Sequence, residues 1–253
     1  MFFDTHAHYD DSRFDEDRNE LLLSLKQHNV SYVVNVGADI KSSQNSINLA
    51  NKFDFVYASV GIHPHDAINA KEEDYDQLKE WLQLDKVVAL GEIGLDYYYD
   101  HSPKDIQRQV FKKQLKICEN VTKPVIIHSR EASQEVFDIL KESGVKKGVI
   151  HAYSGSAQMA LEYIKMGFYI GVGGVVTFKN ANKLVDVVKN IPLENILIET
   201  DCPYLTPTPF RGTRNSSIYL NYIVEKIAEI KNIDKKIVEQ TTFDTAKKFF
   251  CIN

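Results

Sequence analysis

The chain opens with Phe-Phe-Asp-Thr-His-Ala-His at residues 2–8, a short apolar stretch that ends in two histidines. If this stretch is a β-strand, His6 and His8 point to the same face, because side chains alternate along a strand. Two neutral imidazoles on one face can hold a metal ion such as Zn, Fe or Ni. An isolated His-x-His pair also fits a polar strand end near solvent, so the rest of the chain has to decide.

Length and composition indicate an ordinary globular domain. The 253 residues are 26% charged and 43% hydrophobic, and α/β barrels commonly use about 250 residues as one domain. We therefore expect residues 1–253 to form a single domain. The formal net charge of −5 argues against broad binding of a nucleic-acid backbone through a basic surface. It does not exclude a small anionic substrate that is held by metal.

The cysteines and the amino terminus indicate a reducing compartment. Cys118, Cys202 and Cys251 are an odd, widely spaced set without Cys-x-x-Cys, so no disulfide framework is expected. We interpret Cys202 as a small, buried apolar residue. Neither a secretory leader nor a run of about 18 apolar residues is visible. The expectation is a cytoplasmic protein with no membrane contact and no obligate protein partner.

Short apolar segments alternate with longer amphipathic segments along the whole chain. Strands buried on both faces should be short and rich in Val and Ile. Such segments lie at residues 2–8, 31–37, 56–63, 87–92, 124–128, 147–151, 168–174 and 196–201. Predicted helices include residues 15–28, 72–84, 104–119, 132–141, 157–166, 181–189, 215–230 and 234–249. The last of these helices follows the eighth strand–helix pair as an extra closing element.

Eight strand–helix units predict an α/β fold, a single (β/α)8 TIM-type barrel with an extra C-terminal helix. The alternative is a doubly wound open sheet. That fold is expected to carry Gly-x-Gly-x-x-Gly after an early strand. Here the glycine-rich stretch at residues 171–174 comes late and lacks the third glycine at the required spacing, which favours the barrel.

Polar residues follow the predicted strands where they end, and in a barrel these ends meet at one face. Six of the eight histidines lie at such ends, whereas His28 and His101 do not. The strand-end residues are His6, His8, His63, His65, Glu92, His128, Arg130, His151 and Asp201. Scattered core or surface histidines would not collect there, so we predict a metal site at this face.

Six of these residues are the predicted metal centre. Four imidazoles and two carboxylates exceed what one tetrahedral ion needs, and they suit two divalent ions about 3.5–4 Å apart. Glu92 is placed to bridge the ions. The pair would lower the pKa of a shared water and generate hydroxide near neutral pH. Asp201 is the candidate to orient that water and take its proton; a role as a plain ligand is the alternative, and both can hold.

Other residues at the predicted mouth have two interpretations each. For His63 and His65 we favour substrate contact or support of a ligand over a purely structural role. Arg130 shares a face with His128 and is a candidate phosphate clamp. Arg211 lies in the last strand–helix loop, where barrels often bind phosphate. The three tyrosines at 97–99 either stack on bases or close the loop over the mouth.

The sequence resembles the TatD family of metal-dependent deoxyribonucleases, within the amidohydrolase-like barrels. The resemblance covers nearly the whole chain, and six motifs occur in the family's order. They are Phe-Asp-Thr-His-Ala-His (3–8), Gly-Ile-His-Pro-His (61–65), Gly-Glu-Ile-Gly-Leu-Asp-Tyr-Tyr (91–98), Pro-Val-Ile-Ile-His-Ser-Arg (124–130), His-Ala-Tyr-Ser-Gly-Ser (151–156) and Glu-Thr-Asp-Cys-Pro-Tyr-Leu-Thr-Pro (199–207).

The resemblance implies that His6, His8, Glu92, His128, His151 and Asp201 are the metal ligands. It implies hydrolysis of DNA phosphodiesters, often from a 3′ end, with Mg²⁺, Mn²⁺ or Zn²⁺. DNA ends or short oligonucleotides would be the substrate. Two positions depart from the family: Ala152 stands where a cysteine is usual, and residues 215–217 replace Asn-Glu-Pro.

Two other functions are compatible with the same fold. One is a carbonyl hydrolase, such as an amidase, lactonase or aminoacyl-tRNA deacylase. Many of those barrels bridge their metals with a carboxylated lysine, whereas here the fourth and fifth predicted strands end in Glu92 and His128. The other is a barrel that binds metal only for stability, which a surplus of ligands disfavours because structural sites close with four.

Overall fold

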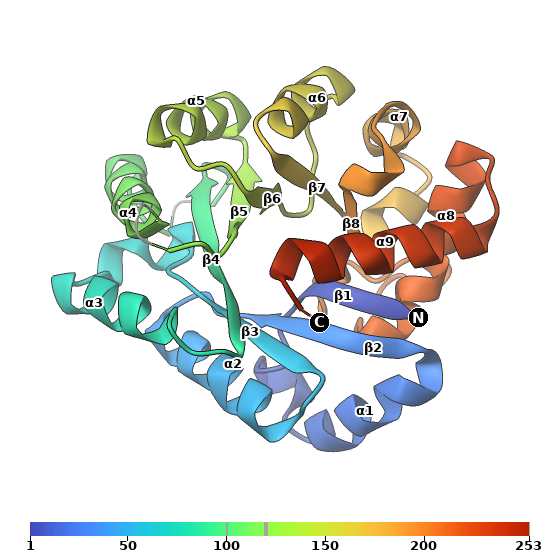
Figure 1. The fold of residues 1–253 in the computed structure, drawn as a ribbon, viewed down its shortest axis with the longest axis horizontal. Coiled ribbons are helices and arrows are strands. Elements are labelled where there is room, and N and C mark those ends of the chain that lie inside the picture. Colours follow the sequence, from blue (N-terminus) through green and yellow to red (C-terminus); the bar gives the residue numbers. More distant parts are fainter. Residues whose placement is uncertain (100, 119–120, 253) are drawn as a thin grey trace.

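The computed structural model describes residues 1–99, 101–118 and 121–252. Eight strands form one sheet in which each strand pairs in parallel with the next along the chain. The strands are β1 (Phe2–Ala7), β2 (Val30–Val36), β3 (Val56–Val60), β4 (Val87–Asp96), β5 (Val125–Arg130), β6 (Gly148–Ile150), β7 (Phe168–Val172) and β8 (Ile196–Ile198). Figure 1 shows the sheet curled into a ring with helices around it, so the predicted (β/α)8 barrel is confirmed.

Backbone contacts between β1 and the segment after β8 close the ring. The amide of Asp201 donates to the carbonyl oxygen of His6 at 2.9 Å, and the amide of His8 donates to that of Cys202 at 2.8 Å. The prediction that the eighth strand runs to Asp201 was wrong, since β8 ends at Ile198. Asp201 and Cys202, beyond the strand, nevertheless lie beside His6 of β1 and His8, which follows β1.

The α-helices in the described residues are α1 (Arg18–Ser24), α2 (Ile40–Lys52), α3 (Glu72–Trp81), α4 (Lys104–Ile117), α5 (Ser133–Ser143), α6 (Ala157–Lys165), α7 (Asn182–Asn190), α8 (Leu220–Lys231) and α9 (Lys235–Phe250). The predicted helices are found with shifted ends, and the predicted end at Glu119 lies outside the described residues. Helix α2 is additional. Its many Ser and Asn residues have modest helix propensity, but Asp39 caps it by accepting the amide of Ser42 at 2.6 Å.

Strand β4 is longer than predicted, because it runs to Asp96 rather than ending at Glu92. Its register with β5 is irregular around Glu92 and places Gly94 opposite His128. Gly94 has a φ of 147°, and a Cβ there would lie 2.0 Å from the carbonyl oxygen of His128. Only glycine fits this conformation and this close approach. The irregular stretch carries Glu92, whose side chain reaches histidines of other strands.

A hydrophobic core at the amino end closes the barrel interior. Helix α9 crosses this end in Figure 1. Its residues Phe243, Phe249 and Phe250 pack with inward-facing strand residues such as Phe3 and Val34. Full burial of a phenylalanine side chain stabilises a fold by roughly 1.5–3 kcal/mol. The three phenylalanines therefore hold α9 against the amino end of the barrel. The carboxyl ends of the strands are therefore the open mouth.

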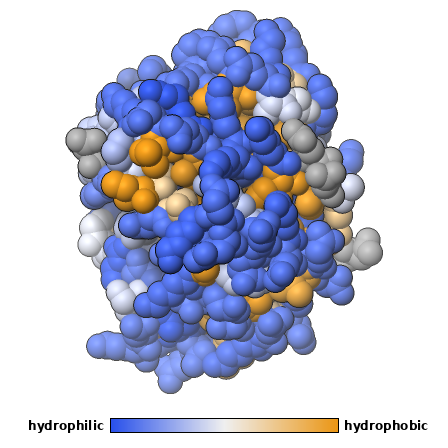
Figure 2. All heavy atoms as spheres, turned by 90° about the vertical axis from the view of Figure 1, so that its left-hand side faces the viewer, coloured by the Kyte–Doolittle hydropathy of each residue, from blue (hydrophilic) through white to orange (hydrophobic). Residues whose placement is uncertain are grey.

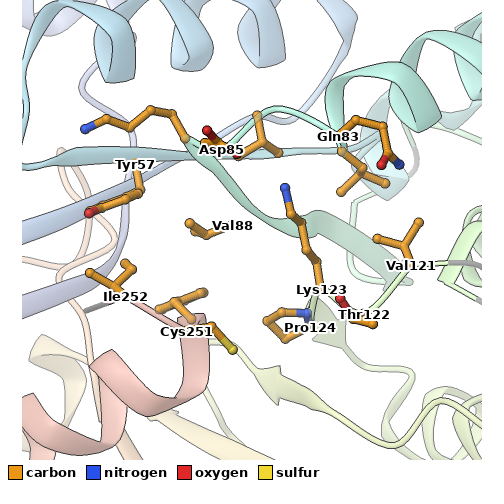
Figure 3. A pocket seen from close by; sticks show the side chains of 14 residues that line it. Tyr57, Gln83, Asp85, Val88, Val121, Thr122, Lys123, Pro124, Cys251 and Ile252 are labelled. Atoms are coloured by element: carbon orange, nitrogen blue, oxygen red, sulfur yellow. The ribbon is translucent and has the colours of Figure 1, made fainter.

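One side of the barrel is largely polar (Figure 2). Figure 2 shows the side that carries the helices at the left of Figure 1, where hydrophilic groups dominate and apolar groups form small separate areas. A cleft of about 610 Å³ lies at the amino end and is lined by Tyr57, Lys123 and Cys251 among others (Figure 3). This cleft contains none of the predicted metal or substrate residues. Within the described ranges, no helix has the length and apolar character needed to cross a membrane.

Candidate metal centre

The six predicted ligand residues meet at the mouth of the barrel. They come from β1, β4, β5 and the segments directly after β1, β6 and β8, and they are His6, His8, Glu92, His128, His151 and Asp201. His6, Glu92 and His151 are buried, and the other three are half-buried. Residues separated by up to 195 positions in the sequence are thus brought into one cluster because the carboxyl ends of parallel strands converge.

One set of donor atoms surrounds the amino-terminal histidine pair. His6 Nε2 lies 3.2 Å from His8 Nε2 and 3.3 Å from Glu92 Oε2, and His8 Nε2 lies 3.4 Å from Asp201 Oδ1. His8 Nε2 lies 4.0 Å from Glu92 Oε2. Ligand bonds of about 2.0–2.2 Å keep two ligands of one ion within about 4.4 Å. The donor atoms of His6, His8 and Glu92 therefore fit a single divalent ion, and Asp201 adjoins them through His8.

A second set gathers around the other oxygen of Glu92. His128 Nδ1 lies 2.7 Å from Glu92 Oε1, His63 Nε2 lies 3.7 Å from it, and His151 Nε2 lies 3.9 Å from it. His151 Nε2 is also 3.7 Å from Asp201 Oδ1. The two oxygens of Glu92 thus face two different groups of imidazoles. A carboxylate so placed could hold one ion on each side.

Hydrogen bonds at the far side of each imidazole orient two of the candidate ligands. His8 Nδ1 lies 3.0 Å from the carbonyl oxygen of Val36, which requires the proton on Nδ1 and leaves the Nε2 lone pair facing the donor set. His128 Nε2 lies 3.0 Å from Asp96 Oδ2, so its Nδ1 faces Glu92. His8 therefore presents a lone pair for a cation, and His128 presents one at Nδ1 once a cation displaces the proton that faces Glu92.

His63 is built as a hydrogen-bond donor. Its Nδ1 accepts the amide of His65 at 3.1 Å, so the ring proton sits on Nε2, the atom that faces Glu92. An N–H group cannot coordinate a metal, so in this tautomer His63 faces Glu92 as a donor, although with Glu92 and His128 it forms a group that could hold an ion. His65 is more exposed than His63, and its Nε2 lies 3.0 Å from Asp96 Oδ2.

Asp96 and Glu199 support the histidines from behind. Asp96 accepts the amides of Tyr98 and Tyr99 at 3.0 Å through Oδ1, while its Oδ2 faces two histidines. Asp96 therefore both caps the loop and orients the histidines. Glu199 was not predicted as a site residue. It is buried, accepts the amide of Ala152 at 2.6 Å and lies 3.0 Å from His151 Nδ1. Its position two residues before Asp201, in the same motif, is the sequence feature that could have indicated a role at the site.

We expect Glu199→Gln to weaken metal binding without unfolding the protein. The amide can still accept the Ala152 amide, but it no longer offers a charged partner to His151 Nδ1. Loss of such a supporting carboxylate typically costs about 10–100-fold in metal affinity or activity. Metal titration of the chelator-treated protein by calorimetry measures the change. Glu194→Gln, at an exposed position just before β8, is the matched control. Native affinity in Glu199→Gln would limit Glu199 to anchoring Ala152.

Neighbouring histidines keep both carboxylates ionised against the effect of burial. Burial raises the pKa of Glu92, but the surrounding histidines, led by His151 and His6, hold it well below its usual range. Burial likewise opposes ionisation of Asp201, and His151 and His8 outweigh it and lower its pKa. Burial lowers the pKa of His8, but the carboxylates of Asp201 and Glu92 outweigh it and raise that pKa to about 9. A cation binding here competes with protons for the histidines.

Buried polar groups beneath the centre hold Asp201 in place. Asp4 accepts the Oγ1–H of Thr200 and the Oγ–H of Ser217, both at 2.6 Å, and Asn215 Nδ2 donates to the carbonyl oxygen of Thr200 at 2.8 Å. The adjacent Asp201 has a φ of 56°, in the left-handed region that aspartate adopts at a modest cost. Asn215 and Ser217 belong to the loop that departs from the family pattern, and the structure gives them this supporting role.

Arginine and aromatic side chains form the rim of the mouth. The Arg130 guanidinium carbon lies 4.0 Å from the ring centre of Tyr98, and that of Arg211 lies 3.7 Å from the ring centre of Phe178. Neither guanidinium donates a hydrogen bond to a residue that the structure describes. Tyr97 differs from Tyr98, because its hydroxyl donates to Glu135 at 2.7 Å and anchors the loop. The rim therefore has free N–H groups for an anion.

A (β/α)8 barrel whose mouth gathers imidazoles around a shared carboxylate has the construction of a metal-dependent hydrolase. The model of the TatD related DNase family matches residues 3–251. The chain therefore belongs to the TatD family, and it is a metal-dependent hydrolase.

Relatives and solved structures agree with this assignment. The chain is 46% identical to the uncharacterized metal-dependent hydrolase YabD of Bacillus subtilis, with all of both chains covered. It is 30% identical to the 3′-5′ ssDNA/RNA exonuclease TatD of Pectobacterium carotovorum, with 98% of each chain covered. The crystal structure of the TatD homologue YjjV from Escherichia coli superposes with a TM-score of 0.94 at 30% identity, covering 100% of this chain and 98% of that one.

Proposed function

We propose that this protein hydrolyses phosphodiester bonds of single-stranded DNA from a 3′ end, with two divalent ions, Mg²⁺, Mn²⁺ or Zn²⁺. The six residues His6, His8, Glu92, His128, His151 and Asp201 would hold the ions. The observation that carries the proposal is Glu92, whose two oxygens face separate groups of imidazoles. The similarity to a relative named as a 3′-5′ ssDNA/RNA exonuclease supports the class of substrate.

The side chains divide the work of hydrolysis between them. Divalent ions, when bound, neutralise the charge of a phosphate and lower the pKa of an attacking water. Asp201 is ionised at neutral pH and accepts the proton of that water. His63 donates its Nε2–H toward a phosphate oxygen. Arg130 and Arg211 contribute guanidinium groups at the rim, where they bind further phosphates of the substrate.

A substrate panel tests the proposed reaction. Metal-loaded protein is incubated with 5′-labelled single-stranded DNA, with the same strand blocked at its 3′ end, with a chromogenic phosphodiester, and with esters and lactones. We expect stepwise shortening of the free strand and none of the blocked strand. Faster hydrolysis of esters or lactones than of any phosphodiester would overturn the proposal in favour of a carbonyl hydrolase.

We expect weak dependence of DNA binding on salt, because few phosphates are engaged. The chain carries a formal charge of −5, and the positive charge at the mouth comes from the metal ions and a few arginines. Each neutralised phosphate of a single strand contributes about 0.7 to the slope of log affinity against log salt. One to three contacts give a slope between roughly −0.7 and −2. The measurement is binding of the Asp201→Asn variant to a short oligonucleotide over a salt series.

A circular single strand is the control for end recognition. It presents the same phosphates and bases but no terminus, so we expect it to resist cleavage. Efficient cutting of the circle, or a salt slope steeper than about −4, would contradict end-directed binding and indicate an extended DNA-binding surface.

A further inference from the structure

Two exposed tyrosines stand on opposite sides of the candidate metal centre. Tyr98 follows β4 and is 54% exposed, and Tyr204 follows β8 and is 46% exposed. The strands of the ring lie in chain order, so β4 and β8 are four positions apart among eight. Loops that follow these two strands therefore face each other across the mouth. Tyrosine is intermediate in burial, and its ring offers a large apolar face. The two half-exposed rings are therefore available to a ligand at the mouth.

Each tyrosine is held by an arginine on one face of its ring. The guanidinium carbon of Arg130 lies 4.0 Å from the ring centre of Tyr98, and that of Arg13 lies 4.0 Å from the ring centre of Tyr204. The Tyr204 hydroxyl also donates to Asp11 at 3.1 Å, and Asp11 pairs with Arg13. One ring face is thus fixed by a cation while the ring remains about half exposed.

Contacts link both rings to the groups that would hold the ions. The ring centre of Tyr204 lies 6.4 Å from that of His8. On the other side the link is indirect, because Tyr98 packs on Tyr99 with centres 4.8 Å apart, and Tyr99 lies 5.4 Å from His65. His65 shares Asp96 with the candidate ligand His128. A planar group resting on Tyr204 would therefore adjoin the centre, and one resting on Tyr98 would lie on the opposite rim.

We propose that Tyr98 and Tyr204 are nucleobase-stacking subsites on the two sides of the scissile phosphate, each stiffened by its arginine. This inference rests on the proposed function, because it assigns the bases of the same single strand. Stacking on aromatic rings tolerates every base, and an arginine beside the ring adds attraction to the strand. The two tyrosines would thus bind the two nucleosides that flank the cleaved bond, without the need for a long basic surface.

An arginine beside a tyrosine is also an ordinary packing arrangement, so the chain needs an internal comparison. Tyr57 supplies it. Lys86 lies 4.6 Å from the ring centre of Tyr57, in the cleft at the amino end of the barrel (Figure 3). The same kind of pair, placed far from the mouth, should have no influence on a bound strand.

The test measures stacking separately from cleavage. An oligonucleotide with the fluorescent base 2-aminopurine at its last or its penultimate 3′ position is bound to metal-loaded Asp201→Asn protein, in which turnover is slow. Stacking on an aromatic ring quenches this fluorophore. We then compare Tyr98→Leu, Tyr204→Leu, the stacking-competent Tyr98→Phe and Tyr204→Phe, and the control Tyr57→Leu. Thermal melting verifies that each variant is folded.

We expect each mouth leucine variant to bind about 5- to 150-fold more weakly, the range for loss of one stacked base. Quenching should disappear at one of the two positions, and the position should differ between Tyr98→Leu and Tyr204→Leu. An abasic nucleotide at that position should remove the effect of the corresponding substitution. The phenylalanine variants and Tyr57→Leu should behave like the parent.

The outcomes separate the two proposals. Quenching and affinity that do not respond to either tyrosine overturn the stacking subsites, whether or not DNA is cut. Tyrosine-dependent quenching by a protein that shortens no strand would support the subsites and overturn the proposed hydrolysis of DNA. Equal losses with intact and abasic strands would also overturn them, because the tyrosines would then act on the fold of the mouth rather than on a base.

Discussion

Replacement of Glu92 by alanine is expected to abolish turnover and to lower bound metal from two equivalents toward one or none. Its Oε2 lies 3.3 Å from His6 Nε2, and its Oε1 lies 2.7 Å from His128 Nδ1. Removal of one side chain therefore takes a donor from both groups of imidazoles. The charge that offsets the clustered histidines is lost as well, so a second cation is repelled more strongly.

Metal content after gel filtration and the rate on a chromogenic phosphodiester measure this effect. Glu92→Gln gives a graded comparison, because the amide keeps one oxygen donor but no charge. Glu194→Ala removes an exposed carboxylate outside the mouth and should keep native metal content and rate. If Glu92→Ala retained two equivalents of metal and a near-native rate, Glu92 would not be the shared ligand.

The donor positions were predictable because they depend on two simple regularities. Alternation along β1 places the two histidines of His-x-His together, and their Nε2 atoms lie 3.2 Å apart. Convergence of strand ends then brings His128, His151 and Asp201 to the same place, as the strand count implied. The burial of the free Cys202 was likewise expected, because an unpaired cysteine behaves as a small apolar residue. Assignment of these residues as metal ligands stays a prediction.

The supporting residues could not be predicted because their function depends on distant partners. Asp4 contacts Thr200 and Ser217, about 200 positions away, and nothing in the local sequence announces those contacts. Glu199 acts through the backbone of Ala152 and the ring of His151. Such contacts are set by register between strands rather than by periodicity along one strand.

Strand ends were the least predictable part of the fold, and for a physical reason. Gly94 and its close approach to His128 let β4 continue beyond the reactive carboxylate Glu92. At β8 the regular strand ends at Ile198, three residues before Asp201, which has a positive φ, and Cys202 then forms an isolated bridge with Ala7. Backbone conformations that position reactive side chains depart from regular strands, so a pattern of apolar residues does not report them.

Substitution of Asp201 by asparagine is expected to reduce the rate by about 10²–10⁴-fold while the protein stays folded and keeps at least one metal. Asp201 Oδ1 lies 3.4 Å from His8 Nε2 and 3.7 Å from His151 Nε2. An amide oxygen at this place can coordinate a cation weakly, but it cannot accept the proton of an attacking water. The backbone bond from the Asp201 amide to His6 is unaffected by the change, so the barrel should remain closed.

Rate, metal content and thermal stability therefore have to be measured on the same preparation of Asp201→Asn. The expected pattern is a large fall in kcat on both DNA and a chromogenic diester, with retained melting behaviour and at least one bound equivalent. Asp186→Asn, an exposed change on α7, is the control and should leave all three unchanged. A loss of less than tenfold would make Asp201 a dispensable ligand and would move the acceptor role to another group. A large loss with the metal retained would instead separate proton transfer from metal binding, because the substitution keeps the size of the side chain and one oxygen but replaces the charged, basic second oxygen with an NH2 group.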